Sequence, residues 1–141
     1  MSYLEGKHLP PVNGETAPYW EGCRNGELRL QRCDGCGSVQ FYPRLLCSRC
    51  GERDLSWITA SGSGRVRSFT IVRRAVSAAY EPDVPYVVAL IELAEGPTMM
   101  SNVVGCDPET VEIGMPVRVT FERWTDEITM PLFEPARDSG A

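Results

Sequence analysis

The second half of the chain alternates between hydrophobic and polar residues with a period of two, the spacing of strands that bury one face. In 115–124, the side chains of Val117, Val119 and Phe121 are expected to point inward. A helical turn is expected at 107–111, between the third and fourth strands. Five strands with this insertion predict an OB-fold barrel, and an SH3-like barrel is the competing prediction. The strands are expected at 64–74, 85–93, 98–105, 115–124 and 130–135.

The second predicted strand, 85–93, is hydrophobic on both faces. Its odd-numbered positions, from Val87 to Leu93, are expected to fill the barrel. Val88 and Leu90 then point outward and need cover, from the N-terminal part of the chain or from another protein. Leu132 and Phe133 lie in a proline-flanked apolar segment that raises the same question. Internal cover and a subunit interface remain two interpretations of these residues.

The first half of the chain contains shorter elements. Thr16 is expected to cap a short helix that ends near Asn25. The helix carries Tyr19 and Trp20, which either pack internally or anchor a partner. Glycines near residue 62 mark a joint between two parts. The predicted organisation is mainly β: a flexible N-terminus at 1–16, a helix plus a cysteine-containing ribbon at 17–60, the barrel at 61–136 and a tail at 137–141.

Four of the six cysteines form two matched motifs, CDGCG at 33–37 and CSRCG at 47–51. Each motif holds two thiols in a tight turn, and the glycine after it tolerates positive φ. Two such turns supply the four thiolates of a closed tetrahedral zinc site, which leaves no open position for substrate. A structural zinc ion is therefore predicted in a rubredoxin-like ribbon, with iron as the alternative metal. The expected ligands are Cys33, Cys36, Cys47 and Cys50.

Composition restricts the function further. The net charge is -5 and the sequence pI is about 4.9, which disfavours nucleic-acid binding. There is one histidine, His8, so chemistry that needs a histidine pair cannot come from this chain alone. No hydrophobic run reaches the length of a membrane helix. The N-terminus lacks a secretory pattern, so a cytoplasmic location is expected, where thiols stay reduced. Cys23 and Cys106 have no paired partner and are expected to be small buried residues.

The order of these motifs resembles one family, the zinc-ribbon-plus-OB-fold proteins known as domain of unknown function 35. The matching pieces cover about residues 17–136. They are Tyr19-Trp20, CDGCGSVQFYPR, CSRCG, GRVRSFTIV, PYVVALIELAEGPTM, NVVG and the Ile113-Gly114 that precedes VRVTF.

The resemblance implies a function that composition does not give. Members of this family bind thiolase-like enzymes, including sterol-carrier-type thiolases, that process coenzyme A thioesters by thiolysis, condensation or retro-aldol cleavage, as in sterol side-chain breakdown. The resemblance therefore implies a non-catalytic accessory subunit, in a heterotetramer built on a thiolase dimer. Its zinc is structural, and the catalytic residues come from the partner.

Acyl-CoA as a shared ligand requires arginines for phosphate and apolar surface for pantetheine. The first barrel strand is rich in arginine, and alternation puts Arg65, Arg67 and Arg73 on one side and Arg74 on the other. The loop that follows contains tyrosines able to lie against an acyl chain or adenine. The candidate CoA-binding residues are Arg65, Arg67, Arg73, Arg74, Tyr80 and Tyr86. A solvated basic strand face is the competing interpretation.

Two other classes of function stay open at this point. OB-folds and zinc ribbons bind single-stranded nucleic acids, and Phe69 lies among the arginines while Trp124 ends the fourth strand. The acidic pI counts against that class. An independent enzyme is the third class, but the carboxylates are scattered along the chain and no poised acid–base pair is evident.

Overall fold

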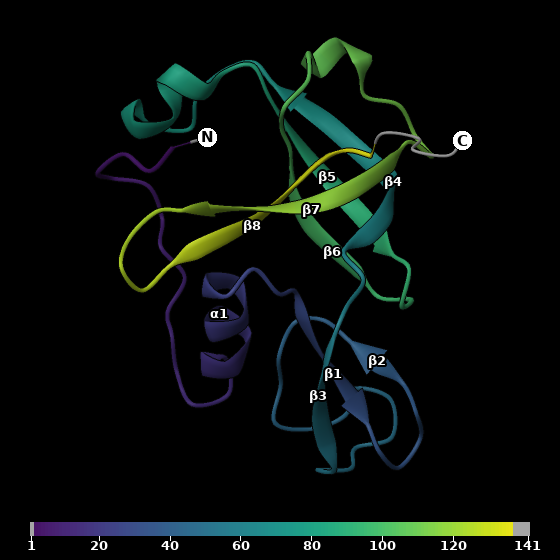
Figure 1. Cartoon of the computed structure of the whole chain (residues 1–141). Helices are drawn as coiled ribbons and strands as arrows, with labels where there is room; N and C mark the ends of the chain where they lie inside the picture. The colour runs from purple at the N-terminus through teal and green to yellow at the C-terminus, as the bar shows by residue number, and fades with distance from the viewer. Residues whose placement is uncertain (1, 137–141) are drawn as a thin grey trace.

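The computed structural model describes residues 2–136, which form an N-terminal part and a β-barrel (Figure 1). The N-terminal part contains α1 (Ala17–Arg24), β1 (Arg29–Cys33), β2 (Val39–Gln40) and β3 (Leu55–Thr59). The barrel contains β4 (Ser63–Val72), β5 (Tyr86–Leu93), β6 (Thr98–Val103), β7 (Pro116–Arg123) and β8 (Thr129–Pro135). Two 3₁₀ turns lie between strands, η1 (Ala78–Asp83) and η2 (Pro108–Thr110). The predicted tail at 137–141 lies outside the described residues.

The barrel confirms the OB-fold prediction. Its five strands close in the order β4-β5-β6-β8-β7, and β6 pairs with β8 in parallel at Val103 and Phe133. The turn η2 lies between β6 and β7, where the sequence predicted a helical turn. On β5, the alternation of buried positions runs from Val87, which is fully buried, to Leu93. Period-two patterning thus identified both the strands and the face that fills the barrel.

A β-bulge on β4 corrects the expected placement of the arginines. Val66 pairs with Ile91 and Ser68 pairs with Leu90, so Arg67 is an extra residue in the strand. The buried positions consequently change parity after the bulge. Simple alternation from Arg65 therefore does not hold beyond the bulge, and Arg73 lies after the end of β4.

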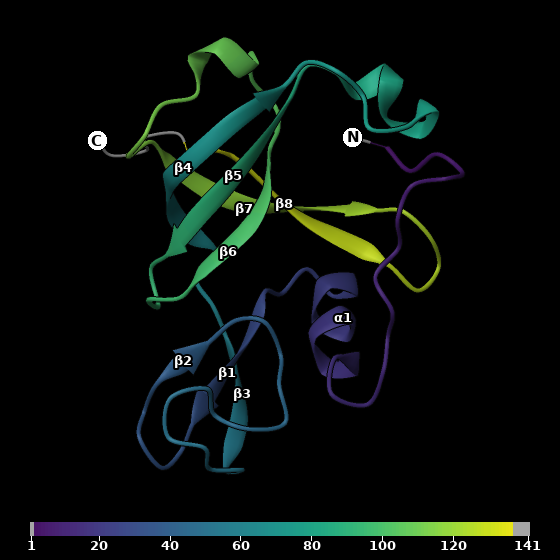
Figure 2. The ribbon, with the colours of Figure 1, turned by 180° about the vertical axis from the view of Figure 1, so that it is seen from behind.

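The ribbon is a three-stranded antiparallel sheet with the order β2-β1-β3. Its third strand, β3, was not among the predicted elements, and its five residues pair with the whole length of β1. Figure 2 shows α1 beside this sheet and beneath the barrel strands. The helix contributes Tyr19 and Trp20 to the same hydrophobic core as Leu28, Val87 and Phe133. The ribbon and the barrel thus share one core.

Helix α1 begins after Thr16, but the predicted side-chain cap is wrong. The Thr16 hydroxyl accepts from the Asn13 backbone N–H, and the Asn13 side-chain oxygen accepts from the backbone N–H groups of Glu15 and Thr16. An Asn13 turn therefore leads the chain into the helix. Within residues 2–136, no helix is long and apolar enough to span a membrane.

Residues 2–16 contain no helix or strand, yet Lys7 anchors this segment. The ammonium group of Lys7 is fully buried and forms an ion pair with Asp83 of η1. It lies 5.1 Å from the ring centroids of both Tyr80 and Trp124. This buried contact ties the segment around Lys7 to η1 and to the turn after β7.

Candidate functional site

The two cysteine motifs form matching knuckles at one end of the ribbon. Gly37 and Gly51 have φ values of +77° and +79°, a conformation that glycine adopts without strain. The Gly37 N–H donates to the Cys33 carbonyl over 2.8 Å, and Gly51 repeats this contact with Cys47 over 3.0 Å. These turns bring the two thiols of each motif to the same point.

The four sulfur atoms lie within 4.8 Å of one another. Two pairs are separated by 3.6 Å, Cys33 with Cys50 and Cys36 with Cys47. A tetrahedral ion with Zn–S bonds of about 2.3 Å requires S···S separations of about 3.8 Å, which the cluster meets. Backbone N–H groups of Cys50 and Arg49 donate to the Cys47 sulfur and lower the pKa of this thiol to about 6. The residues therefore fit a structural zinc ion held by four thiolates, whose chemistry is to cross-link the ribbon.

Two buried glutamines hold the loop between the knuckles, and no sequence pattern predicted this role. The Gln40 amide donates to the Gln31 side-chain oxygen over 2.8 Å. Gln31 also donates to the Arg44 carbonyl and accepts from the Arg44 N–H, each over 2.8 Å. Gln40 accepts from the Ser48 N–H over 2.8 Å. These bonds pair backbone polar groups of a loop that has no secondary structure of its own. They also position the second knuckle.

The thiol of Cys23 lies apart from the metal site, on the buried face of α1. It is 0% exposed, as expected from the sequence, and burial raises its pKa to about 12. Burial also raises the pKa of the neighbouring Tyr19 hydroxyl, with a further contribution from Cys23. Cys106, the other unpaired cysteine, is half-buried. Cys23 is therefore a packing residue that stays protonated at neutral pH.

The burial of Cys23 predicts a loss of stability at alkaline pH. An unfolded thiol releases its proton near pH 9, whereas folded Cys23 keeps it to about pH 12, so the unfolded state binds fewer protons in this interval. The free energy of unfolding should fall as pH rises, with a slope of at most about 1.4 kcal/mol per pH unit for one proton. Urea unfolding at several alkaline pH values measures the slope. Cys23→Ala should make it shallower, and equal slopes for the two proteins would contradict the assignment.

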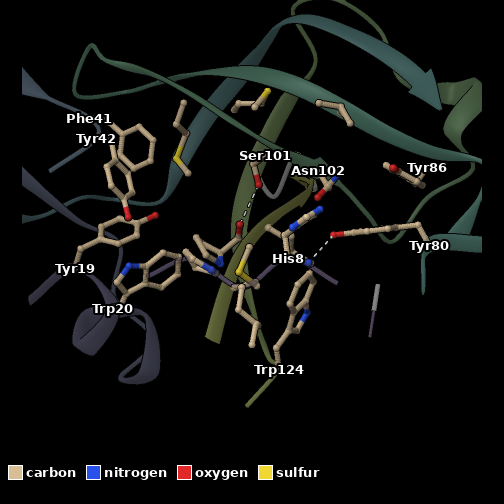
Figure 3. Close-up of a pocket in the computed structure, with 18 of the residues that line it drawn as sticks. His8, Tyr19, Trp20, Phe41, Tyr42, Tyr80, Tyr86, Ser101, Asn102 and Trp124 are labelled. Carbon is tan, nitrogen blue, oxygen red and sulfur yellow. Dashed lines mark hydrogen bonds between the residues drawn. The ribbon is translucent and has the colours of Figure 1, made fainter. Parts of the chain in front are cut away.

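An apolar cavity with a volume of about 640 Å³ lies between the barrel and the N-terminal part. Its walls come from residues 8–10, α1, the end of β2, η1, β5, β6, β8 and the turn at Trp124. In Figure 3, an aromatic group around Tyr19 and Trp20 forms one end, and Tyr80, Tyr86 and Trp124 form the other. We call this space the aromatic cavity. It was not predicted, because its walls are distant in the sequence.

The residues predicted for a partner interface divide into two sets in the structure. Phe133 is 0% exposed and Leu132 is 1% exposed, so internal packing rather than a partner covers this segment. Tyr19 and Trp20 are also buried, at 1% and 3% exposure, in edge-to-face contact at 4.9 Å, and they line the aromatic cavity from inside. The predicted interface residues that remain at least partly exposed, Val88 and Leu90, lie on the outer face of β5.

The exposed part of that outer face extends from β5 to β6. Leu90 is 40% exposed and pairs directly with Met100, which is 67% exposed. Val88 is half-buried and lines the rim of the aromatic cavity. These three residues form a continuous apolar surface, which we call the β5–β6 face.

The residues predicted to bind CoA also separate. Tyr80 and Tyr86 line the aromatic cavity, with ring centroids 6.3 Å apart, whereas none of the four arginines does. Arg65 donates to the Gly114 carbonyl, and Arg73 forms an ion pair with Glu109 of η2. Arg74 is exposed and forms no ion pair within residues 2–136. The structure therefore brings the two tyrosines together at the cavity but does not bring the four arginines to it.

Two family models match consecutive parts of this chain. Residues 20–56 match the rubredoxin-like zinc ribbon domain of ChsH2, and residues 57–122 match its C-terminal OB-fold domain. A DUF35 domain-containing scaffold protein of Methanothermobacter thermautotrophicus is 35% identical, over 80% of this chain and 86% of that protein. The chain belongs to the DUF35 family of zinc-ribbon and OB-fold proteins.

Longer relatives share the same region. A probable enoyl-CoA hydratase alpha subunit of Thermomonospora curvata is 37% identical over 90% of this chain, which spans only 39% of that protein. A 3-oxo-4,17-pregnadiene-20-carboxyl-CoA hydratase alpha subunit of Mycobacterium tuberculosis is 37% identical, over 83% of this chain and 37% of that protein.

Solved structures repeat the architecture. A chain of the Ltp2-ChsH2(DUF35) aldolase superposes with a TM-score of 0.80 and 36% identity, covering 90% of this chain and 98% of that one. A DUF35 protein of Sulfolobus solfataricus superposes with a TM-score of 0.66 at 16% identity, covering 89% of this chain and 85% of that one, which shows the shared fold.

Proposed function

We propose that this protein is a non-catalytic accessory subunit of a thiolase-like enzyme that acts on acyl-CoA thioesters. The observation that carries the proposal is the likeness over 98% of a chain from a solved aldolase complex, at 36% identity. The relatives named as CoA hydratase subunits support coenzyme A thioesters as the class of substrate. Thiolysis, condensation and retro-aldol cleavage in sterol or lipid degradation are the reactions that fit such a partner.

The side chains of this chain explain why the proposal assigns catalysis to the partner. Within the described residues, the four metal-binding cysteines are the one cluster of His, Cys, Asp and Glu that could hold a metal ion. A closed four-thiolate site offers no coordination position to a substrate. The single histidine has no second histidine to act with. In this proposal the partner therefore supplies the catalytic groups, and this chain supplies surface and stability, in a compartment such as the cytoplasm that keeps thiols reduced.

We place the partner on the β5–β6 face. Leu90 and Met100 are large apolar side chains that lie opposite each other on paired strands and remain exposed. Association with a sterol-carrier-type thiolase would bury them and remove this apolar area from water. Because thiolase-like enzymes are dimers in this proposal, two copies of this chain bind one dimer and form a heterotetramer.

The proposal predicts a stable complex on co-expression. A tagged copy of this chain should co-purify with a thiolase-like protein of the same organism and elute as one heterotetramer on gel filtration. Leu90→Asp with Met100→Asp should abolish co-elution, because two carboxylates would be buried without partners. Leu45→Asp with Ile113→Asp, at positions that are 70% and 69% exposed and lie outside this face, is the matched control. Separate elution of the unmodified proteins would refute the proposal.

We also propose that two of the predicted arginines, Arg73 and Arg74, help to bind acyl-CoA. Arg73 and Arg74 follow β4 directly and precede η1, which carries Tyr80 toward the aromatic cavity. Arginines at this position can bind CoA phosphates by charge-assisted hydrogen bonds, once a phosphate displaces Glu109 from Arg73.

Charge reversal tests this role in the complex. Arg73→Glu with Arg74→Glu should raise KM for the acyl thioester about tenfold and leave kcat little changed, because binding alone is weakened. Arg32→Glu with Arg53→Glu, at two exposed ribbon positions that are not metal ligands, makes the same change in net charge and should leave KM unaltered. An unchanged KM in the first variant would remove the arginines from the site.

A further inference from the structure

The two cysteine knuckles have matching backbones but carry different side chains at one equivalent position. The Cys33 N–H donates to the Ser38 carbonyl, and the Cys47 N–H donates to the Glu52 carbonyl, each over 2.8 Å. Ser38 and Glu52 therefore occupy the same place in their knuckles, two residues after the second cysteine. One of these side chains ends in a hydroxyl group and the other in a carboxylate, so the two halves of the metal site are not chemically equivalent.

The hydroxyl group of Ser38 lies against the metal-binding sulfur atoms. Its Oγ is 3.1 Å from the Cys36 sulfur and 4.0 Å from the Cys47 sulfur. A cysteine that binds a metal is a thiolate without a proton, so in the loaded site the hydroxyl is the donor and the sulfur is the acceptor. Donors of this kind orient metal ligands, and their removal typically lowers metal affinity about 10- to 100-fold. Ser38 thus supports the Cys36 thiolate as a ligand.

The outer cysteine of the second knuckle, Cys50, lacks an equivalent side-chain donor. The ionised carboxylate of Glu52 accepts hydrogen bonds but cannot donate one. Within residues 2–136, the side chains in contact with the Cys50 sulfur are those of the other metal-binding cysteines. Cys36 and Cys50 are both exposed, so access to solvent does not distinguish them. The Ser38 hydroxyl does.

We propose that Ser38 retains the Cys36 thiolate on the metal, and that Cys50 is the ligand that dissociates first. Exchange of the metal therefore begins at the second knuckle. Cys33 and Cys47 are buried and accept backbone N–H groups of their own motifs over 3.4 Å, so they dissociate later. The inference goes beyond the proposed function, because it concerns this chain without its partner.

Competitive alkylation of the zinc-loaded full-length protein tests the order of dissociation. A thiolate that leaves the metal displaces iodide from iodoacetamide, and trypsin places Cys36 and Cys50 on separate peptides because Arg44 and Arg49 lie between them. In protein that has been modified once, Cys50 should carry the label at least about fivefold more often than Cys36. Equal labelling of the two thiols, or preferential labelling of Cys36, would overturn the inference.

Variants at the two equivalent positions test the role of the hydroxyl group. Ser38→Ala should make the labelling of Cys36 and Cys50 about equal and should speed zinc transfer to the chelator 4-(2-pyridylazo)resorcinol about tenfold. Ser38→Thr keeps a hydroxyl group and should preserve the order seen in the unmodified protein. Glu52→Ser places a hydroxyl group in the second knuckle and should lower the labelling of Cys50 toward that of Cys36. A Ser38→Ala protein that keeps the original preference for Cys50 would show that the inference is wrong.

A second ribbon serine provides the matched control. Ser56 donates to the Asp34 carboxylate over 2.9 Å and not to a sulfur atom, so Ser56→Ala should change neither the labelling ratio nor the rate of zinc transfer. Cys106→Ser in every protein removes a half-buried thiol that competes for the reagent, and thermal melts should show that each variant is folded. If Ser38→Ala and Ser56→Ala alter the ratio alike, the hydroxyl group acts through general stability of the ribbon and the inference fails.

Discussion

Replacement of Cys36 by serine is expected to release the metal and to prevent the ribbon from folding. Three thiolates cannot close the tetrahedral site, and the binding free energy of a structural zinc ion, about 10 kcal/mol or more, is folding free energy for a segment this small. The ribbon between its knuckles has a two-residue strand and a loop held by Gln31 and Gln40. Little else in this region can replace the metal cross-link.

Unfolding of the ribbon should also destabilise the rest of the protein. Leu28 and Leu30 on the ribbon side share a core with α1 and the barrel, and Phe41 lines the aromatic cavity. Most of the variant protein should therefore be insoluble, and any soluble fraction should contain no stoichiometric zinc by metal analysis. Cys106→Ser alters a half-buried thiol outside the metal site and serves as the control. A Cys36→Ser protein that retains one zinc and melts like the unmodified protein would contradict a structural role for the site.

The sequence predicted the barrel well because its signals are local. Alternation on β5 identified the buried row from Val87 to Leu93, and the spacing in the two motifs identified all four metal ligands. Both signals depend on residues within a few positions of one another. The ribbon strand β3 was missed because Leu55–Thr59 shows no clear alternation, and each of its first four residues is half-buried. Its pairing with β1 comes from tertiary contacts.

The features that alternation missed depend on single insertions and on long-range contacts. One extra residue at Arg67 changes the parity of β4, and nothing in the local sequence marks the bulge. Tyr19 and Trp20 were candidates for an exposed anchor, yet both are buried, and Tyr19 packs against Phe41 and Tyr42. The aromatic cavity combines segments from His8 to Leu132, so no local motif reveals it. Lys7 illustrates the same limit, because its acceptor, Asp83, lies 76 residues away.

Omission of this chain is expected to abolish the acyl-CoA activity of the complex. The protein alone should show no turnover, because it offers one histidine and a closed metal site. The thiolase-like partner alone should lose at least about 100-fold in kcat/KM, which corresponds to about 3 kcal/mol of transition-state stabilisation. The physical reason, under the proposed function, is that the partner would lose both the surface that supports it and the proposed contacts with the thioester. Addition of the zinc-loaded chain should restore activity, with saturation at one chain per partner subunit.

The most direct test of the accessory role is acyl-CoA turnover measured in parallel for this chain, for the thiolase-like protein that co-purifies with it, and for their mixture. The account predicts turnover in the mixture alone. Turnover by this chain without a partner would contradict it, and so would full activity of the partner in the absence of this chain.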